Sequence, residues 1–245
     1  MQKVALITGG SRGIGKATAE EFAKNGYNVA IIYKSHQEVA EKLAKTLSEK
    51  YQTKVVAIET DISDETQINS LKTQIEQEFS RLDILVNNAG IVFDKDFQDR
   101  TLADFQKTFE VNVFGTFLMS KIFGKMILAT ANTGSIINIS STSGISDFTP
   151  TSIDYAASKA AIVSLTKDLA IEFAPQIRVN TIAPGWVDTD MNKDLPEELF
   201  IEMRENFLLG RLAEPTEIAN LIYFVASEKA SFINGAYIPI DGGRK

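Results

Sequence analysis

The chain has 245 residues, 44% of them hydrophobic, so it is long enough to bury a sizeable core. Its 25 Lys and Arg residues against 32 Asp and Glu residues give a net charge of −7, which argues against nucleic acid and anionic membranes as partners. With no cysteine and one histidine, thiol chemistry is excluded and no metal site is expected. The start of the chain lacks a signal-peptide pattern and no apolar run approaches about 18 residues, so we expect a cytoplasmic protein.

Short β-branched runs alternate with helical patterns along the chain. Most of the runs are apolar on both alternations, which is typical of strands covered on both faces. Seven runs are predicted as strands: 4–8, 29–33, 54–59, 83–88, 135–140, 178–183 and 237–240. Between them, apolar stripes with helical spacing run through 39–47 and 68–79. This alternation predicts one α/β domain over 1–245, with a doubly wound, Rossmann-type parallel sheet and helices on both faces.

Two further helical segments depart from this simple alternation. Residues Thr101 to Leu128 are predicted as one long helix, which opens with TLAD and carries phenylalanines along one face. Residues 190–210 form an additional helical segment after the sixth strand. Because ligands bind beyond the carboxyl ends of parallel strands, we expect 190–210 to cover the site as a lid.

The first strand runs directly into TGGSRGIGKATAEEF. Three glycines in a tight turn before a helix leave free N–H groups, which together with the helix dipole can hold a pyrophosphate. The pattern T-G-x-x-x-G-x-G matches neither G-x-G-x-x-G nor the Walker spacing literally. A plain strand-to-helix turn rarely needs three glycines, so the stretch predicts a nucleotide cofactor. The residues of this turn expected at the cofactor are Gly9, Ser11, Arg12, Gly13, Ile14 and Gly15.

The chain resembles the short-chain dehydrogenase/reductase family in TGGSRGIG, in NNAG at 87–90, in Asn112, around Ser141 and in YAASK at 155–159. The resemblance extends from the first strand to INGAYIPIDGG near the C-terminus. Local sequence such as GRLAEPTEIANLIYFVAS is similar to bacterial 3-oxoacyl-acyl-carrier-protein reductases. The resemblance implies an oxidoreductase of the EC 1.1.1 type that exchanges a hydride with a carbonyl or alcohol.

The resemblance also implies cofactor contacts outside the glycine turn. They are Asp61 and Ile62 at the adenine, Asn88, Ala89 and Gly90 along the cofactor trough, and Pro184, Gly185, Val187 and Thr189 at the nicotinamide end. The alternative for NNAG is an ordinary buried strand end, although two adjacent asparagines are costly in a core unless their amides are satisfied.

The tip of the second strand usually decides between NAD and NADP, because an acidic side chain there accepts the ribose hydroxyls of NAD. Here the tip reads Tyr33, Lys34, Ser35, and no carboxylate follows until Glu38. We expect Lys34 and Arg12 to converge on a 2′-phosphate, with Ser35 beside them. The alternative is that both cations are ordinary surface charges. This tip predicts NADP(H) as the cofactor.

Tyr155 and Lys159 lie four residues apart, and therefore on one helical face, among small residues that leave room for a cofactor. Reduction of a carbonyl requires a proton and stabilisation of negative charge on oxygen. A nearby cation favours phenolate, so we expect Lys159 to lower the pKa of Tyr155 and make it usable as a general acid or base. The resemblance implies that Lys159 also binds the nicotinamide ribose. A solvated helix face is the alternative.

A second donor for the carbonyl oxygen is expected from NISSTSG at 138–144. Alignment with the family motif assigns this role to Ser141, fourteen residues before Tyr155. The hydroxyls that remain open are Ser140, Thr142 and Ser143. Asn112 lies in a predicted helix, where asparagine is disfavoured. By resemblance it anchors a water that relays protons to the lysine, and the alternative is a satisfied buried amide.

These features predict an NADPH-dependent reductase whose best substrate class is 3-oxoacyl thioesters. A sugar, polyol, steroid or small ketone remains open as the substrate. A sensor that binds NADP without turnover is disfavoured, because such proteins typically lose a catalytic residue and none is missing here.

Recognition of acyl-carrier protein stays uncertain, because a basic docking surface is expected for an acidic carrier. Ile171 stands where relatives commonly place arginine, and Lys125 is the one basic residue in 125–134. Arg204 and Arg211 are the candidates that could substitute. By analogy with relatives we expect a homotetramer built on the two long helices near 101–128 and 155–173.

Overall fold

The computed structural model describes residues 2–148, 150–190 and 207–243. Seven strands form one parallel sheet in the order β3-β2-β1-β4-β5-β6-β7. Their bounds are β1 Val4–Thr8, β2 Asn28–Tyr33, β3 Val55–Glu59, β4 Ile84–Asn87, β5 Gly134–Ile139, β6 Ile177–Pro184 and β7 Tyr237–Ile240. Every predicted strand is confirmed with its ends within one residue. The central strands are buried apolar runs, and the edge strands β3 and β7 are only partly buried.

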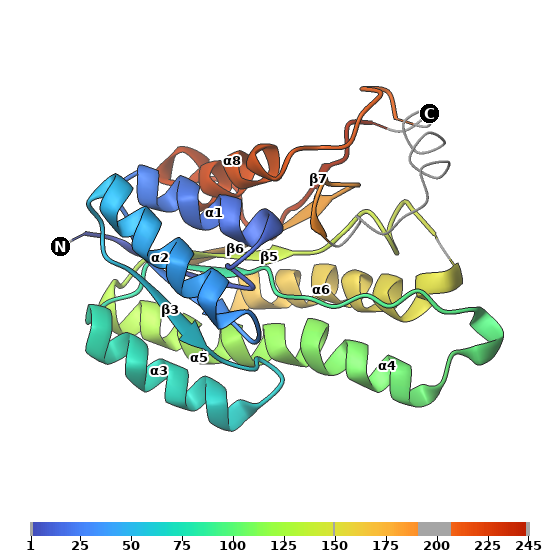
Figure 1. Cartoon of the computed structure of the whole chain (residues 1–245), viewed down its shortest axis with the longest axis horizontal. Helices are drawn as coiled ribbons and strands as arrows, with labels where there is room; N and C mark the ends of the chain where they lie inside the picture. The colour runs from blue at the N-terminus through green and yellow to red at the C-terminus, as the bar shows by residue number, and fades with distance from the viewer. Residues whose placement is uncertain (1, 149, 191–206, 244–245) are drawn as a thin grey trace.

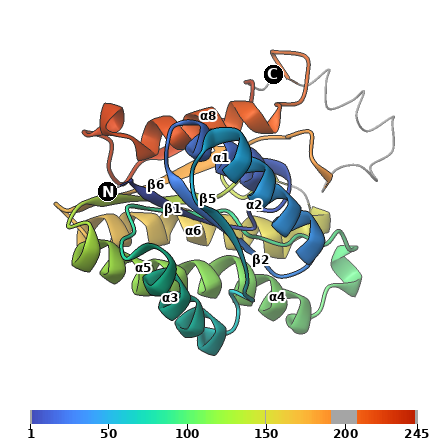
Figure 2. The same ribbon diagram turned by 60° about the vertical axis from the view of Figure 1, so that its left-hand side comes forward.

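Helices cover both faces of this sheet, as Figures 1 and 2 show. Their bounds are α1 Gly13–Lys24, α2 Gln37–Tyr51, α3 Glu65–Phe79, α4 Leu102–Phe109, α5 Thr116–Thr130, α6 Ile153–Glu172 and α8 Pro215–Ala226. Helices α1, α2 and α8 lie on one face, and α3, α5 and α6 lie on the other. The doubly wound, Rossmann-type prediction is therefore confirmed.

The core consists of two apolar layers, one on each side of the sheet. Successive residues of β1 alternate between them: Leu6 joins the layer that contains Phe123 of α5, and Ile7 joins the layer that contains Phe22 of α1. All four side chains are fully buried. Burying a side chain of this size contributes roughly 1.5–3 kcal/mol, so the central strands are held firmly from both faces. The carboxyl ends of the strands are thereby fixed relative to one another.

The long helix predicted from Thr101 is interrupted, which corrects that prediction. A capping box does begin it: Thr101 N donates to Asp104 Oδ2 at 2.7 Å, and Asp104 N donates to Thr101 Oγ1 at 3.3 Å. However, α4 ends at Phe109, and a π-helical turn over Glu110–Gly115 separates it from α5. A π turn adds a residue without changing the apolar character of the segment, so hydrophobic periodicity could not locate it.

The stretch Leu102–Thr130 is long and apolar enough to cross a membrane by length and composition alone, with a mean hydropathy of 1.3 in its most apolar window. In this structure its α5 part packs against the sheet, where Met119, Phe123 and Ile127 are fully buried. Helix α5 is therefore a core helix of the α/β fold.

The segment expected to form a lid, 190–210, lies mainly outside the described residues. Where the description resumes, Leu208 N donates to Gly243 O at 3.1 Å and Leu209 N donates to Gly242 O at 3.2 Å. These bonds attach 207–210 to the chain that follows β7.

Candidate functional site

The glycine turn, residues 9–15, connects β1 to α1 at the carboxyl edge of the sheet. Gly9 and Gly13 have φ of +63° and +52°, a region that favours glycine. Gly15 needs glycine for space, because a Cβ there would lie 2.2 Å from the Gly9 carbonyl oxygen and 2.6 Å from Asn88 Nδ2. The turn is therefore folded tightly against the end of β4.

Hydrogen bonds between β1 and the NNAG segment hold the glycine turn in place. Thr8 Oγ1 accepts from the backbone N–H groups of Asn88 and Ala89, both at 3.0 Å. Asn88 Nδ2 donates to the carbonyl oxygens of Thr8 at 2.9 Å and Gly9 at 3.1 Å. The asparagine amide is thus satisfied by the turn it supports. Sequence reasoning gave no role to Thr8, although it is the first residue of the glycine pattern.

The start of α1 offers the N–H groups that an anionic cofactor requires. Arg12 precedes the helix without capping it through its side chain, so the first-turn donors are not occupied by a cap. Ser11 is buried, and Ile14 is half-buried in the first turn. A Cβ added to Gly13 would lie 3.3 Å from the Thr189 methyl group, so the segment after β6 borders the same turn. The residues present fit the diphosphate of a dinucleotide.

The tip of β2 differs from the sequence-based expectation. Lys34 forms an ion pair with Asp61, which follows β3, so a carboxylate does stand near the strand tip. Burial raises the pKa of Asp61, but hydrogen bonds from Lys34 and Ser63 lower it overall. The expectation of a tip without a carboxylate considered only residues adjacent in sequence, whereas β3 pairs with β2 and brings Asp61 alongside. The Lys34 side chain is 66% exposed and Ser35 is exposed, while Ile62 is buried.

The loop after β5 brings one hydroxyl to Tyr155. Ser141 and Tyr155 share a hydrogen bond, and Ser141 Oγ also accepts from the Ser143 backbone N–H at 3.1 Å. Ser140 Oγ instead donates to the Lys159 carbonyl oxygen at 2.7 Å, and Thr142 Oγ1 donates to a neighbouring aspartate at 3.0 Å. Of the four candidate hydroxyls, Ser141 therefore has the geometry expected for a second donor. We refer to Ser141, Tyr155 and Lys159 as the Tyr155 corner.

Lys159 is 5% exposed, and its Nζ donates to the Ile139 carbonyl oxygen at 2.8 Å. Nζ lies 5.5 Å from the centre of the Tyr155 ring. A Cβ added to Gly90 would lie 3.3 Å from both Lys159 Nζ and Asn112 Oδ1. The lysine, the asparagine and the NNAG glycine therefore meet at one point, directly beyond β4.

Burial controls the ionisation of this pair more than their mutual attraction does. Desolvation raises the pKa of Tyr155, and the hydrogen bond from Ser141 lowers it only in part. Desolvation also lowers the pKa of Lys159 to about 8. The expectation that Lys159 lowers the pKa of the phenol is therefore not met in this structure. At neutral pH the phenol keeps its proton, which is the form a general acid needs.

Asn112 lies in the π turn and is 1% exposed. Its Oδ1 accepts from the Ile91 backbone N–H at 2.8 Å, and its Nδ2 donates to the Ile91 carbonyl oxygen at 3.0 Å and to Ser158 Oγ at 3.0 Å. The side chain thus joins the chain after β4 to α6. π turns are frequent at functional sites, where they redirect a side chain. Ser158, inside the YAASK motif, is a participant that sequence reasoning missed.

Of the four residues expected at the nicotinamide end, Pro184 is the last residue of β6 and the other three follow it. Thr142 N donates to the Pro184 carbonyl oxygen at 3.0 Å, which joins this end of β6 to the loop that carries Ser141. Gly185 N donates to the Ile240 carbonyl oxygen at 3.0 Å, and Val187 forms a bridge with Ala213. The segment therefore lies at the same edge of the sheet as the Tyr155 corner.

Comparisons with known proteins agree with this geometry. A family model described as Enoyl-(Acyl carrier protein) reductase matches residues 9–245. A short-chain type dehydrogenase/reductase from Mycobacterium marinum superposes with a TM-score of 0.92 and 35% identity, covering 98% of this chain and 94% of its own. The chain belongs to the short-chain dehydrogenase/reductase family. As a member of that family it is an oxidoreductase that uses a nicotinamide cofactor.

Two curated relatives within the short-chain dehydrogenase/reductase family differ in substrate. The 3-oxoacyl-acyl-carrier-protein reductase of Aquifex aeolicus is 40% identical over 243 residues, which is 98% of this chain and 96% of the relative. The 3alpha-hydroxysteroid dehydrogenase of Mediterraneibacter gnavus is 38% identical over 245 residues, which is 99% of this chain and 97% of the relative. The relatives of this chain therefore share the family but not one substrate.

Proposed function

We propose that this chain is an NADPH-dependent carbonyl reductase with one catalytic domain, and that its substrates are 3-oxoacyl thioesters. The observation that carries the proposal is the Tyr155 corner, in which Tyr155 and Ser141 share a hydrogen bond one helical turn from Lys159. This corner and the glycine turn lie at the same edge of the sheet. A carbonyl placed between them would meet both a proton donor and a cofactor.

In the proposed reaction, a nicotinamide cofactor held by the glycine turn would supply the hydride that the carbonyl carbon needs. Tyr155 donates its proton to the carbonyl oxygen, and Ser141 donates a hydrogen bond to the same oxygen as negative charge develops there. Lys159 has one donor engaged by Ile139, which leaves its other N–H groups for the nicotinamide ribose. Asn112 fixes the chain after β4, and we propose that it also anchors the water that returns protons to Lys159.

The remaining cofactor contacts are part of the same proposal. The glycine turn binds the diphosphate, Lys34 and Arg12 bind the 2′-phosphate, and Asp61 contacts the adenine. Because Lys34 is paired with Asp61, NADPH must compete with that pair for the lysine. We therefore expect a preference for NADPH that is real but moderate.

The substrate proposal rests on similarity to the reductase of Aquifex aeolicus. The steroid dehydrogenase of Mediterraneibacter gnavus supports a second candidate, oxidation or reduction of a steroid. A screen of NADPH oxidation with 3-oxoacyl thioesters, 3-ketosteroids and small ketones separates the two. Higher kcat/KM on ketosteroids than on every thioester would discard the thioester assignment and keep the carbonyl chemistry.

We propose that the acyl chain matters more than the carrier. Arg211, one of the two candidate docking cations, forms an ion pair with Glu217 at 2.7 Å, and Ile171 is 78% exposed where relatives commonly place arginine. The other candidate, Arg204, lies outside the described residues. Because few basic residues would attract an acidic carrier protein to this surface, we expect kcat/KM with a carrier-bound substrate to depend only weakly on salt. A strong carrier preference that collapses between low and physiological salt would reject this part of the proposal.

We also propose that the enzyme is a cytoplasmic homotetramer. The helices expected to form the interfaces expose apolar side chains, among them Phe114 at 54% and Phe117 at 41%. Exposed aromatic side chains on neighbouring turns are a feature of protein interfaces. Light scattering coupled to size-exclusion chromatography tests the assembly, and a monomeric mass at micromolar concentration would reject it.

A further inference from the structure

Arg100 is a buried arginine that no part of the proposed reaction uses. Its side chain is 2% exposed, although it lies in the loop between β4 and α4. Its Nη2 donates to the carbonyl oxygens of Phe93 at 2.9 Å and of Thr151, which precedes α6. A guanidinium is costly to bury unless it is paired, so its partners define what it does.

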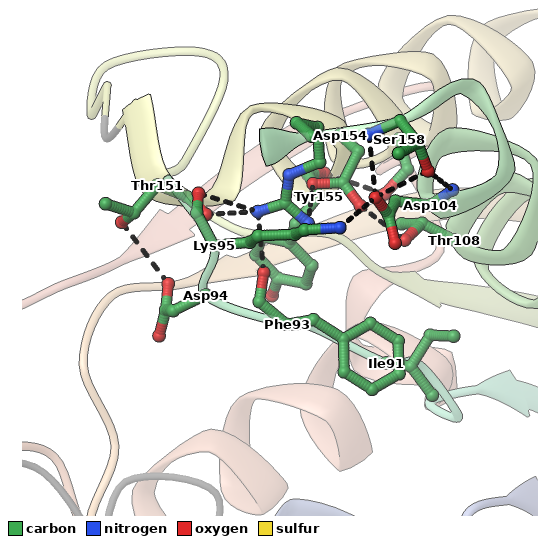
Figure 3. A network of polar contacts seen from close by, with 12 residues as sticks. Ile91, Phe93, Asp94, Lys95, Asp104, Thr108, Thr151, Asp154, Tyr155 and Ser158 are labelled. Atoms are coloured by element: carbon green, nitrogen blue, oxygen red, sulfur yellow. Dashed lines mark hydrogen bonds and ion pairs between the residues drawn. The ribbon is translucent and has the colours of Figure 1, made fainter. Parts of the chain in front are cut away.

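The charge partner of Arg100 is Asp154, the residue directly before Tyr155. Arg100 Nη1 lies 3.2 Å from Asp154 Oδ1, and the aspartate side chain is fully buried. Asp154 Oδ2 accepts a hydrogen bond from Thr108 Oγ1 of α4 at 2.6 Å, as Figure 3 shows. The first turn of α6 is thus attached to the loop after β4 by a buried charge pair and to α4 by a short hydrogen bond.

A second connection joins the same loop to α6 on the other side of Tyr155. Asn112 bonds both backbone groups of Ile91 and also Ser158 Oγ. Ser158 Oγ in turn donates to the Tyr155 carbonyl oxygen at 2.7 Å. The loop that starts at the cofactor trough is therefore connected to α6 directly at Asp154, immediately before Tyr155, and through Asn112 at Ser158, three residues after it.

We propose that Arg100 and Asp154 are positioning residues for Tyr155: their buried ion pair sets the first turn of α6, and so holds the Tyr155 hydroxyl in line with Ser141. This inference rests on the proposed function of Tyr155 as the proton donor. Replacing a buried ion pair with uncharged groups is often neutral for stability, so stability alone gives little reason for the pair. The pair instead connects the loop between β4 and α4 to the residue directly before the proton donor, which gives it a functional reason.

The test is the double variant Arg100→Met/Asp154→Asn, which leaves no unpaired charge in the core and keeps an acceptor for Thr108. Because a misplacement of about 1 Å can cost a factor of about 100 in rate, kcat should fall by roughly ten- to 100-fold. The thermal midpoint and the dissociation constant of NADPH should stay near those of the wild type. A merely structural pair would instead lower the midpoint, or leave kcat unchanged.

Two further variants make the comparison specific. Arg100→Lys keeps a cation but loses the planar fork, so kcat should fall between the wild type and the double variant. Lys95→Met is the matched control, because it removes a 2.8 Å ion pair with Asp104 that joins the same loop to α4 without reaching α6. Its kcat should equal that of the wild type.

A readout that needs no substrate separates this inference from the proposed function. In protein labelled with carbon-13 at tyrosine Cζ, the Tyr155 resonance, assigned with Tyr155→Phe, should shift or broaden in the double variant and stay unchanged in Lys95→Met. An unchanged resonance and an unchanged kcat in the double variant would overturn the inference. A wild-type protein that reduces no ketone in the screen would overturn the proposed function, and the resonance would still decide the inference.

Discussion

The glycine turn and the Tyr155 corner lie at the same edge of the sheet but are built differently. The turn is made of backbone and of residues near in sequence, and a Cβ added to Gly15 would lie 2.2 Å from the Gly9 carbonyl oxygen. The corner depends on side chains from separate segments, since Ser141 follows β5, Lys159 lies on α6 and bonds Ile139, and Asn112 comes from the π turn. Each region contains buried residues, such as Gly15 and Lys159, so burial alone does not distinguish them.

This difference predicts which property each region controls. A binding surface made of backbone changes when the fold of the turn changes, so its variants should alter affinity and stability together. A proton-transfer site made of side chains can lose one atom without losing its shape, so removal of the Tyr155 hydroxyl should alter rate alone. The following substitutions test this separation, in order of decreasing expected effect.

Tyr155→Phe removes the proposed proton donor and nothing else. General acid catalysis is worth roughly 100- to 10,000-fold, so kcat should fall by at least that lower factor while NADPH affinity and thermal stability stay near wild type. Steady-state kinetics, cofactor titration and a melting curve on one preparation check the three quantities. Retention of about a third of the wild-type kcat would remove Tyr155 from the proposed role.

Lys159→Met tests how much burial of the lysine side chain changes the free energy of unfolding with pH. Burial lowers the pKa of Lys159 from 10.5 to about 8, so between these values the unfolded chain holds a proton that the folded chain has released. Wild-type stability should therefore rise with pH across this window relative to the variant, by on the order of 3 kcal/mol, and the difference should be constant below pH 8. Urea unfolding of both proteins at several pH values measures it. Parallel curves from pH 8 to 10.5 would contradict the buried-cation assignment.

Gly15→Ala tests the backbone side of the comparison. The added Cβ would lie 2.2 Å from the Gly9 carbonyl oxygen, so the turn must shift. Overpacking of this kind costs roughly 1–3 kcal/mol, and NADPH affinity should fall with it. Lys24→Ala, at the exposed end of α1, is the control that should change neither. A variant with normal stability and weakened binding would show that even this turn separates the two properties.

Cofactor choice should give the smallest effect. A charge-assisted contact to phosphate contributes about 1.5–3 kcal/mol, so NADPH should bind at least roughly tenfold more tightly than NADH. Asp61→Asn should raise this ratio by releasing Lys34, whereas Tyr33→Asp with Lys34→Ala should reverse it. Because adenine contacts are common to both cofactors, the ratio reports on the contacts to the 2′-phosphate. Equal affinities in the wild-type protein would reject the 2′-phosphate assignment.

The sequence was sufficient for features set by local pattern. Runs such as VALIT and SIINIS are apolar on both faces, which indicates a central strand wherever the run stands. The glycine turn was predictable for the same reason, because a left-handed residue and a close backbone approach each call for glycine. Tyr155 and Lys159 share a helical face at fixed spacing, so their proximity also followed from sequence.

Features set by pairing between distant segments were not predictable. Asp61 reaches Lys34 because β3 lies beside β2, and the sequence alone does not give that alignment of strand ends. Arg100 looks like a surface residue in a polar loop, yet it is buried against Asp154. The effect of burial on the Tyr155 pKa was missed for the same reason: a charge four residues away is visible in a sequence, and the surrounding desolvation is not.

The π turn at Glu110–Gly115 makes the length of this segment matter as much as its composition. A π turn holds about one residue more per turn than the 3.6 of an α-helix, so it accommodates a surplus residue without rotating the helix that follows. Met119 and Phe123 therefore keep the core side of α5, while the surplus residue lets Asn112 be directed at Ile91. Loss of one residue here would restore ordinary winding and leave α5 in phase, but it would redirect the side chains of the turn. An alignment or chimaera that closes this surplus as a gap would thus keep the helix that supports the sheet and lose the position of Asn112.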